Sequence, residues 1–296
     1  MKAYSDYLSE IFPGIKVQKI SIDAGFSCPN RDGRISKGGC IYCRNDSFSP
    51  RYCNPNDSVS IQLEKGKKFF AKKYPDMKYL AYFQSYTGTY NKTIQQLYSL
   101  YKEALMVDKV VGLVVGTRPD CLDDETLNLL AEINKNHPVF LEIGAETSHN
   151  HTLKLINRNH TWEDVENCVK KISSKKIHCG LHLIAGLPGE SDELILSTID
   201  KACKLPIESL KLHQLQVLKG TILHTKICSG DLTVPELSLD KYLDLCIEII
   251  ERVPDNIVIE RFLAQAPPDL VVSPSWGLKN YQFINLLQKK LVTSQK

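Results

Sequence analysis

The residues of this chain whose types and spacing point most directly to chemistry are three cysteines, Cys28, Cys40 and Cys43. Thiolates bind transition metals and iron–sulfur clusters. Three thiolates leave one position of a metal centre open, and a substrate or cofactor can bind there. The loop that carries the cysteines is rich in glycine, which lets a backbone wrap closely around a buried group. The sequence therefore predicts a metal centre that takes part in chemistry.

Two other interpretations of these cysteines stay open. A structural zinc ion would need a fourth ligand, for which Cys53 is the candidate. Such sites normally pair two short Cys-x-x-Cys segments, whereas only Cys40 and Cys43 have that spacing here. Buried thiols without a ligand are less expected in a polar loop. Apart from the zinc alternative for Cys53, the remaining cysteines are interpreted as small buried hydrophobic residues: Cys53, Cys121, Cys168, Cys179, Cys203, Cys228 and Cys246.

The composition is that of a globular protein with a large core, since 43% of the 296 residues are hydrophobic and 24% are charged. No apolar run approaches the roughly 20 residues of a membrane-spanning helix, so we expect no membrane partner. Ten cysteines without an export signal indicate the cytoplasm, where clustered cysteines more often bind metals than form disulfides. A net charge of +3 permits a polyanionic partner such as RNA without requiring one.

Six apolar runs recur along the chain and are typical of strands buried in a parallel sheet. They cover residues 19–24, 79–83, 110–115, 139–143, 181–185 and 210–217. Helix-start residues lie between or after them: Thr93, Asp123, Thr161, Ser191 and Ser238. This alternation predicts an α/β fold, a partial (β/α)6 TIM-like barrel. The cysteine loop follows the first strand, and the loops after barrel strands are where active sites are built.

Three parts are predicted along the chain. Residues 1–18 form an N-terminal helical extension, residues 19–255 form the barrel, and residues 256–296 form a C-terminal capping segment. Within the last part, residues 257–262 have the pattern of a further strand and residues 278–291 that of a helix. No long linker separates these parts, so we interpret the tail as a cap on the barrel rather than a separate domain.

The cysteine spacing, with Tyr42 before the last cysteine, resembles the cluster loop of radical S-adenosylmethionine (SAM) enzymes. The long gap between Cys28 and Cys40 resembles the branch that contains the Elongator catalytic subunit, and in particular its short bacterial relatives, which lack the acetyltransferase domain. Further segments with this resemblance are 81–87, 116–120, 144–147, 157–161, 183–190 and 268–270. The resemblance implies that Cys28, Cys40 and Cys43 bind a [4Fe–4S] cluster and that SAM chelates its fourth iron.

The resemblance also implies which residues bind SAM. Gln84 and Ser85 lie where relatives contact the methionine amino group, and Gly186 lies in a turn beside the adenine. Glu146 and Arg158 lie where relatives supply a polar side chain and an arginine. A guanidinium suits the carboxylate of SAM because it can form two parallel hydrogen bonds with it.

Structural roles are the alternatives for these charged residues. Glu146 follows an apolar strand, where a carboxylate needs a partner, and Arg118 could supply one. Glu142 lies inside the same strand and could be the buried partner of Arg118 instead. Arg158, without the resemblance, would be interpreted as a surface arginine.

Substrate contacts are expected from the strands and loops near the barrel mouth. His182 and His213 lie in the fifth and sixth predicted strands and could face the interior, although a strand histidine is more often a hydrogen-bonded core residue. Lys219, Arg261 and Trp276 are candidates for contacts with phosphates or bases.

The resemblance implies an enzyme that reductively cleaves SAM to a 5′-deoxyadenosyl radical, which then takes a hydrogen atom from a substrate. An external donor of the flavodoxin or ferredoxin type would supply the electron. The implied substrate is tRNA, with remodelling of the wobble-uridine side chain as the expected reaction. Two alternatives stay open: a radical SAM enzyme that acts on a small metabolite, and a zinc-stabilised RNA-binding module without catalysis.

Overall fold

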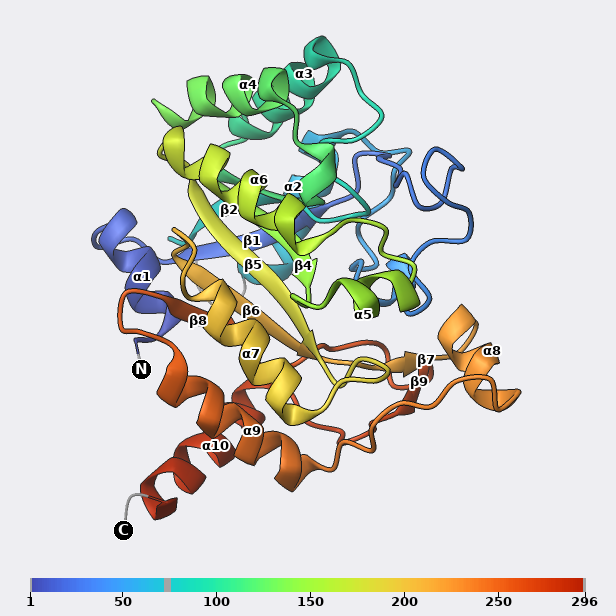
Figure 1. Ribbon diagram of the computed structural model, residues 1–296. Helices are drawn as coiled ribbons and strands as arrows, with labels where there is room; N and C mark the ends of the chain where they lie inside the picture. Colours follow the sequence, from blue (N-terminus) through green and yellow to red (C-terminus); the bar gives the residue numbers. More distant parts are fainter. Residues whose placement is uncertain (1, 72–75, 295–296) are drawn as a thin grey trace.

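A computed structural model describes residues 2–71 and 76–294 of the chain. Its main sheet has seven parallel strands in the order β1-β2-β3-β4-β5-β6-β8, and the sheet curls into a half-barrel (Figure 1). The strands are β1 (Val17–Ile22), β2 (Lys78–Phe83), β3 (Val110–Thr117), β4 (Val139–Glu146), β5 (His178–Ala185), β6 (Ser209–Gln214) and β8 (Val258–Arg261). The predicted fold class, a partial TIM-like α/β barrel, is confirmed.

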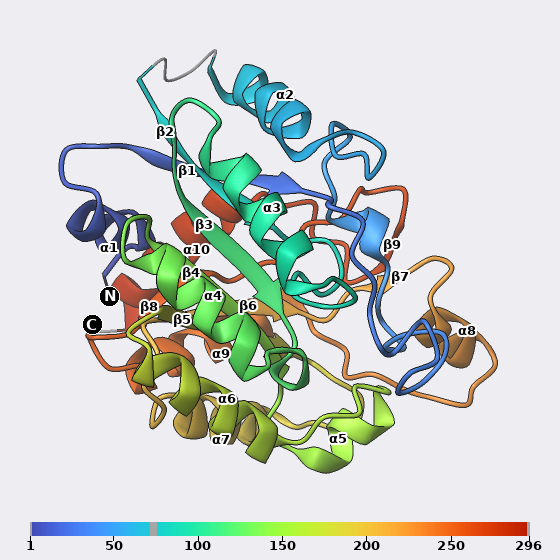
Figure 2. The same ribbon diagram turned by 90° about the horizontal axis from the view of Figure 1, so that it is seen from above.

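The α-helices alternate with the strands along the chain. They are α1 (Tyr4–Ile11), α2 (Val59–Ala71), α3 (Ile94–Leu105), α4 (Asp124–Asn134), α5 (Asn150–Leu155), α6 (Trp162–Ser174), α7 (Asp192–Ala202), α8 (Ile222–Cys228), α9 (Leu239–Arg252) and α10 (Asn280–Ser294). Of these, α2, α3, α4, α6, α7 and α9 cover the convex face of the sheet (Figure 2). Short 3-10 turns cover Asn45–Ser47 and Pro119–Cys121. Because helices cover one face and side chains fill the other, every residue of β4 is buried.

The predicted helix starts are those of the structure. The side chains of Thr93, Asp123, Thr161 and Ser238 accept hydrogen bonds from backbone N–H groups in the first turns of α3, α4, α6 and α9. Ser191 precedes α7 without a side-chain hydrogen bond of this kind. Local capping therefore fixes where these helices begin, whereas the segment between β1 and α2, from Asp23 to Ser58, is long and carries the three cysteines.

The sixth predicted strand, 210–217, is wrong in its extent. Strand β6 ends at Gln214, and residues Val217–Leu218 form a separate strand, β7, that pairs antiparallel with β9 (Val271–Ser273). The break has a long-range cause, because the Gln214 side chain bonds to the backbone N–H and C=O of Ala264. This bond ties the end of β6 to the segment after β8.

Residues 257–262 contain β8, which pairs parallel with β6 and extends the main sheet to a seventh strand. Helix α10 packs against α9, where Tyr242, Trp276 and Phe283 form a stacked aromatic group. The division at residues 18 and 255 stays a prediction, and residues 1 and 295–296 lie outside the described part.

The carboxyl ends of the strands define one end of the half-barrel (Figure 1). The loop between β1 and α2, which carries the cysteines, lies at that end with α5, α8 and the β7–β9 pair, whereas α1 lies at the opposite end. Within the described residues, no helix has the length and apolar character needed to cross a membrane.

Candidate active site

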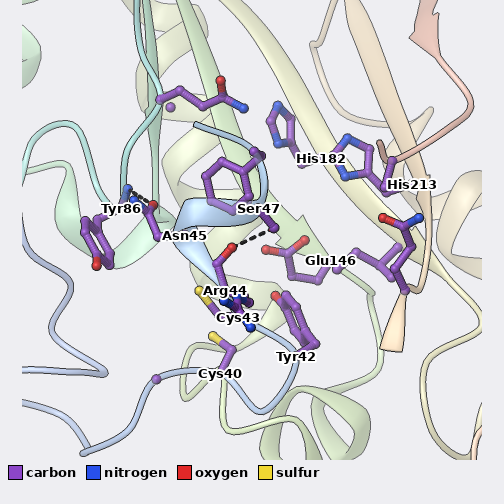
Figure 3. Close-up of a pocket in the computed structure, with 18 of the residues that line it drawn as sticks. Cys40, Tyr42, Cys43, Arg44, Asn45, Ser47, Tyr86, Glu146, His182 and His213 are labelled. Carbon is purple, nitrogen blue, oxygen red and sulfur yellow. Dashed lines mark hydrogen bonds between the residues drawn. The ribbon is translucent and has the colours of Figure 1, made fainter. Parts of the chain in front are cut away.

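A cavity of about 240 Å³ opens where the cysteine loop faces the carboxyl ends of the strands. Cys28, Cys40 and Cys43 all line it. Figure 3 shows Cys40 and Cys43 at one end of the view, His182 and His213 at the other, and Glu146 between them. The cysteine end and the histidine end of this cavity therefore belong to one site, built from strands that are far apart in the sequence.

The cysteine loop is held against the turn that follows α5. The side-chain amide of Asn30 donates to the backbone oxygens of Asn157, at 2.6 Å, and Arg158, at 3.0 Å. In return, the side chain of Asn157 donates to the backbone oxygen of Gly39 at 2.8 Å. Asn157 has a φ of 57°, a left-handed conformation that asparagine adopts more readily than most residues. These bonds place the guanidinium of Arg158 beside Cys40.

Arg158 is buried and uses most of its N–H groups on protein partners. Its Nη2 donates to the backbone oxygen of Gly144 at 2.7 Å and lies 3.2 Å from Glu146 Oε1. Its Nε donates to His160 Nε2 at 3.1 Å, and its Nη1 lies 3.8 Å from Cys40 Sγ. Burial, together with the Arg158 charge, lowers the pKa of His160 to about 3, so His160 is neutral and can accept this bond.

Glu146 ends β4 in a strained conformation. Its φ is 64°, in the left-handed region that few residues other than glycine adopt, and the pairing with β5 shifts register at this point. The next residue, Thr147, donates from its hydroxyl to the buried carboxylate of Glu190 at 2.6 Å. The turn that ends in Glu190 thus anchors the end of β4, and Glu146 lines the cavity beside Arg158.

Three arginines line the cavity near the thiols: Arg31, Arg118 and Arg158. One nitrogen of Arg31 and one of Arg118 are buried without a hydrogen-bond partner. Burial raises the pKa of the Cys43 thiol to about 12, and the neighbouring Cys40 contributes to this rise. A thiolate therefore needs cationic partners in order to form here. Guanidinium groups with unused N–H bonds therefore suit an anionic group held by these cysteines.

Single-ion coordination has less support. Among residues 2–71 and 76–294, no three Cys, His, Asp or Glu side chains lie close enough together to hold one metal ion. Cys53, the expected fourth zinc ligand, instead donates to the backbone oxygen of Ser21 at 3.2 Å and is not among the residues that line the cavity. In an iron–sulfur cluster each thiolate binds a different iron, so the sulfurs need not converge on one point.

The histidine end of the cavity contains two neutral histidines. His182 Nε2 lies 2.7 Å from Glu142 Oε2, and burial and nearby Lys211 lower the pKa of this histidine. Arg261 donates to His213 Nε2 from Nε at 3.2 Å and from Nη2 at 2.9 Å. Burial and the charge of Arg261 hold the pKa of His213 well below its ordinary value. His213 therefore accepts both hydrogen bonds from Arg261, and Arg261 carries the positive charge of the pair.

An interior charge network, formed by Lys19, Tyr82, Glu142, Lys211 and Glu260, lies next to this end. Lys19 bonds to Glu142 and, at 2.6 Å, to Glu260. Lys211 Nζ lies 2.7 Å from Glu142 and 3.2 Å from Glu260, and the Tyr82 hydroxyl donates to Glu142. Burial would raise the pKa of Glu142, but the two lysines hold it well below its ordinary value. The two lysines and two glutamates thus neutralise one another.

The predicted site residues do not all line the same cavity. Gln84 lines the cavity and accepts a hydrogen bond from Ser21, whereas the buried Ser85 is not among its lining residues. Gly186 and Trp276 line a second cavity beside β7. The Lys219 side chain is exposed outside both cavities.

The alternative pairing of Arg118 with Glu142 or Glu146 is wrong. Arg118 forms two parallel hydrogen bonds with Asp120, at 2.8 and 2.7 Å. Asp120 is only two residues away, and the turn Pro119–Cys121 brings its carboxylate back to the guanidinium. Glu142 is instead shared by the interior charge network.

Four members of the interior charge network, all but Glu142, were not predicted from the sequence. The available signal was a charged residue within an apolar strand, as for Lys19 in β1 and Lys211 in β6. A buried charge needs a partner, so each lysine implied a carboxylate on another strand. Arg31 was not predicted either, because only the folded cysteine loop brings its side chain to the cavity.

Comparison with known proteins identifies the family. The family model "Radical SAM superfamily" matches residues 31–202, and the "Radical_SAM C-terminal domain" model matches residues 207–293. The chain therefore belongs to the Radical SAM superfamily, a class of enzymes. Its cofactors are those of the family, a [4Fe–4S] cluster and S-adenosyl-L-methionine.

The chain is also similar to individual proteins. The chain is 33% identical to the uncharacterized protein YtqA of Bacillus subtilis (strain 168) over 96% of this chain and 87% of that protein. It is 25% identical to a tRNA uridine(34) acetyltransferase of Methanocaldococcus jannaschii over 39% of this chain and 21% of that protein. The fold is similar to that of Methanocaldococcus infernus Elp3, with a TM-score of 0.68 at 15% identity over 95% of this chain and 64% of that chain.

Proposed function

We propose that Cys28, Cys40 and Cys43 bind three irons of the [4Fe–4S] cluster and leave the fourth iron to SAM. The observation that carries this proposal is that all three thiols line one cavity together with Arg31, Arg118 and Arg158. Unused guanidinium N–H groups at Arg31 and Arg118 would compensate the negative charge of thiolates and cluster sulfides.

For SAM, we propose Glu146 and Gln84 as the polar contacts from the strand ends, since both line the cavity. Arg158 is mainly a positioning residue, because Gly144, Glu146 and His160 already take its N–H groups. Only its Nη1, beside Cys40, remains directed toward the cysteine end. Ser85 and Gly186 stay predictions with less support, because neither lines this cavity.

When bound, the two cofactors supply the reductive cleavage of SAM to a 5′-deoxyadenosyl radical, which removes a hydrogen atom from the substrate. The chain's residues bind and orient the reactants and exclude water. His182 and His213 lie at the end of the cavity away from Cys40, and Arg261 bonds to His213 there, so we propose these three residues as the substrate side. An external donor of the flavodoxin or ferredoxin type would supply the electron in the cytoplasm.

We propose tRNA as the substrate, with its wobble-uridine side chain as the group that is remodelled. The support is the similarity to a tRNA uridine(34) acetyltransferase and the fold shared with Elp3. Arg44 also lines the cavity, and its partly exposed side chain is suited to contact a phosphate of tRNA. The alternative of a small-metabolite substrate would use the same cavity without tRNA.

The cluster is tested by anaerobic purification, iron and sulfide assay and visible spectroscopy. Wild-type protein should bind iron and sulfide in a cluster, whereas Cys40→Ala should lose most of the cluster and reduce SAM cleavage by at least about 100-fold. Cys53→Ala is the matched control, since its thiol bonds to Ser21 outside the cavity, and it should keep its iron. Equal iron content in Cys40→Ala and wild type would overturn the ligand assignment.

The substrate is tested by nucleoside analysis of tRNA from a strain without this protein. The tRNA proposal predicts that a modified wobble uridine disappears and that its precursor accumulates. Purified holoenzyme should also cleave SAM faster in the presence of that precursor tRNA. An unchanged nucleoside profile, with SAM cleavage that tRNA does not stimulate, would favour the small-metabolite alternative.

A further inference from the structure

Arg261 is a cation that lines the cavity and forms no ion pair with any residue that the structure describes. It ends β8 and lines the cavity beside His213. Across residues 2–71 and 76–294, no carboxylate lies within ion-pair distance of its guanidinium, and His213 is its hydrogen-bond partner. A partly buried guanidinium usually has an anion nearby, because burial removes the water that would otherwise solvate its charge.

The neighbouring charges do not compensate Arg261. The carboxylates of the interior charge network, Glu142 and Glu260, are already paired with its two lysines. The two contacts from Arg261 converge on one nitrogen of His213, which must therefore present its lone pair rather than a proton. The histidine end of the cavity thus carries one uncompensated positive charge.

The geometry also fixes which part of the guanidinium is used. Nε and Nη2 of Arg261 both point N–H bonds at His213, so one edge of the group is occupied. A guanidinium has five N–H bonds in one plane, and its other edge runs across Nη1 and Nη2. That edge keeps two N–H bonds, whose spacing matches the two oxygens of a carboxylate. His213 therefore orients Arg261 and leaves its second edge for a ligand.

We propose that Arg261, oriented by His213, is a binding subsite for a carboxylate group of the substrate. This inference rests on the proposal that the reaction takes place in this cavity, and it adds a chemical class to the substrate. The group recognised is a planar anion at the end of the cavity away from the cysteines. Arg261 is the binding residue, and His213 is a positioning residue.

The test uses reconstituted holoenzyme with SAM under anaerobic conditions. [13C]Acetate is the carboxylate probe, acetamide is its neutral analogue of the same shape, and inorganic phosphate is the tetrahedral anion. Each is titrated at constant ionic strength, and binding is followed by the line broadening of its NMR signal. The wild type should bind acetate at least about tenfold more tightly than acetamide or phosphate, as expected for charge-assisted hydrogen bonds.

Two variants and one control make this result specific. Arg261→Gln should weaken acetate binding by about 10- to 100-fold, and Arg261→Lys should weaken it less, because the charge remains but the planar edge is lost. Arg252→Gln removes an arginine that pairs with Asp200 on the outer surface, and it should change nothing. The affinity for SAM should stay within about twofold of the wild type in Arg261→Lys, which shows that the site is intact.

The outcomes separate this inference from the proposed function. Acetate binding that equals acetamide binding, or that Arg261→Gln leaves unchanged, would overturn the subsite even if tRNA proves to be the substrate. Preference for phosphate over acetate would overturn the carboxylate assignment. Arg261-dependent acetate binding in a protein whose deletion leaves tRNA unchanged would support the subsite and reject the tRNA substrate.

Discussion

The two ends of the cavity each hold an arginine beside a neutral histidine, but the two arginines have different partners. At the cysteine end, Arg158 bonds to His160 and also lies 3.2 Å from the carboxylate of Glu146. At the histidine end, Arg261 bonds to His213 alone among the described residues. One guanidinium is therefore compensated within the protein, and the other is compensated only when an anion enters.

This difference indicates separate roles for similar side chains. A compensated arginine with few unused N–H bonds holds its neighbours in place, so Arg158 connects β4 to the cysteine loop. An arginine with one edge unused can bind a ligand without first breaking an ion pair, and Arg261 is of this kind. Burial alone does not distinguish the two roles, and the distribution of nearby carboxylates does.

The largest expected effect comes from Glu142→Gln. This variant tests whether the interior charge network is neutral in itself and so provides no carboxylate to compensate Arg261. The substitution would leave Lys19 and Lys211 with less negative charge in a buried site. We expect the free energy of unfolding to fall by about 3–5 kcal/mol, measured by urea denaturation of the holoprotein. Acetate should then bind more tightly, because the histidine end becomes more positive.

Glu132→Gln is the control for this change. Glu132 forms an ion pair with Lys135 on the exposed surface of α4, so its loss should alter stability far less. A destabilisation of the same small size in Glu142→Gln would mean that the network is not a closed, neutral unit. The comparison between the two arginines would then lose its basis.

The fold was predictable from the sequence where short-range signals decide it. Apolar runs located the strands because buried parallel strands have few polar residues, as in β4. Capping residues located the helix starts, as at Thr93 and Thr161. The end of β6 was not predictable, because it depends on a bond between Gln214 and Ala264.

The site was predictable at its cysteine end and much less so at the other. The cysteine spacing and the resemblance to radical SAM enzymes pointed to residues that do line the cavity, among them Glu146 and Arg158. Lys19 and Glu260, in contrast, lie 241 positions apart in the sequence and meet only when β1 and β8 come together in the half-barrel. Which charges are compensated is a property of such long-range pairs, so the free edge of Arg261 could not be inferred from sequence.

A smaller effect is expected from Gly144→Ala, which tests the positioning role of Arg158. A Cβ atom at position 144 would lie 2.4 Å from Arg158 Nη2 and 3.0 Å from Glu146 Oε1, so the guanidinium must move and its contacts with Gly144 and Glu146 are disturbed. We expect the affinity for SAM, measured by equilibrium dialysis, to fall by about tenfold. Acetate binding at Arg261 should not change, because the displacement is confined to the cysteine end.

Gly116→Ala is the matched control, since Gly116 lines the same cavity and a Cβ atom there would be 3.5 Å from its nearest neighbour, an ordinary contact. Its affinity for SAM should stay close to that of the wild type. Equal losses in the two variants would show that any added methyl group in the cavity has this effect, and Arg158 would then have no special part in it.

The smallest expected effect is a pH dependence of the free energy of unfolding, to which both ends of the cavity contribute. The pKa of His160 is lowered to about 3 and that of His213 lies well below its ordinary value, in both cases through burial and an adjacent arginine. The unfolded chain, with histidine pKa values near 6.5, then binds more protons than the folded one as the pH falls. The stabilisation is complete above about pH 6.5 and is lost below it, by about 1 kcal/mol per histidine between pH 7.5 and 5.5.

The slope of the unfolding free energy against pH is measured in urea unfolding experiments. His160→Gln and His213→Gln should each remove part of this slope, whereas His151→Gln, at an exposed position, should not. Saturating acetate distinguishes the two ends. An anion on Arg261 offsets the charge that lowers the pKa of His213, so acetate should reduce the share of the slope that His213 contributes. The share from His160 should remain, because Glu146 already compensates Arg158. If acetate changed both shares equally, the two arginines would be electrically equivalent, and the distinction between a positioning arginine and a binding arginine would fail.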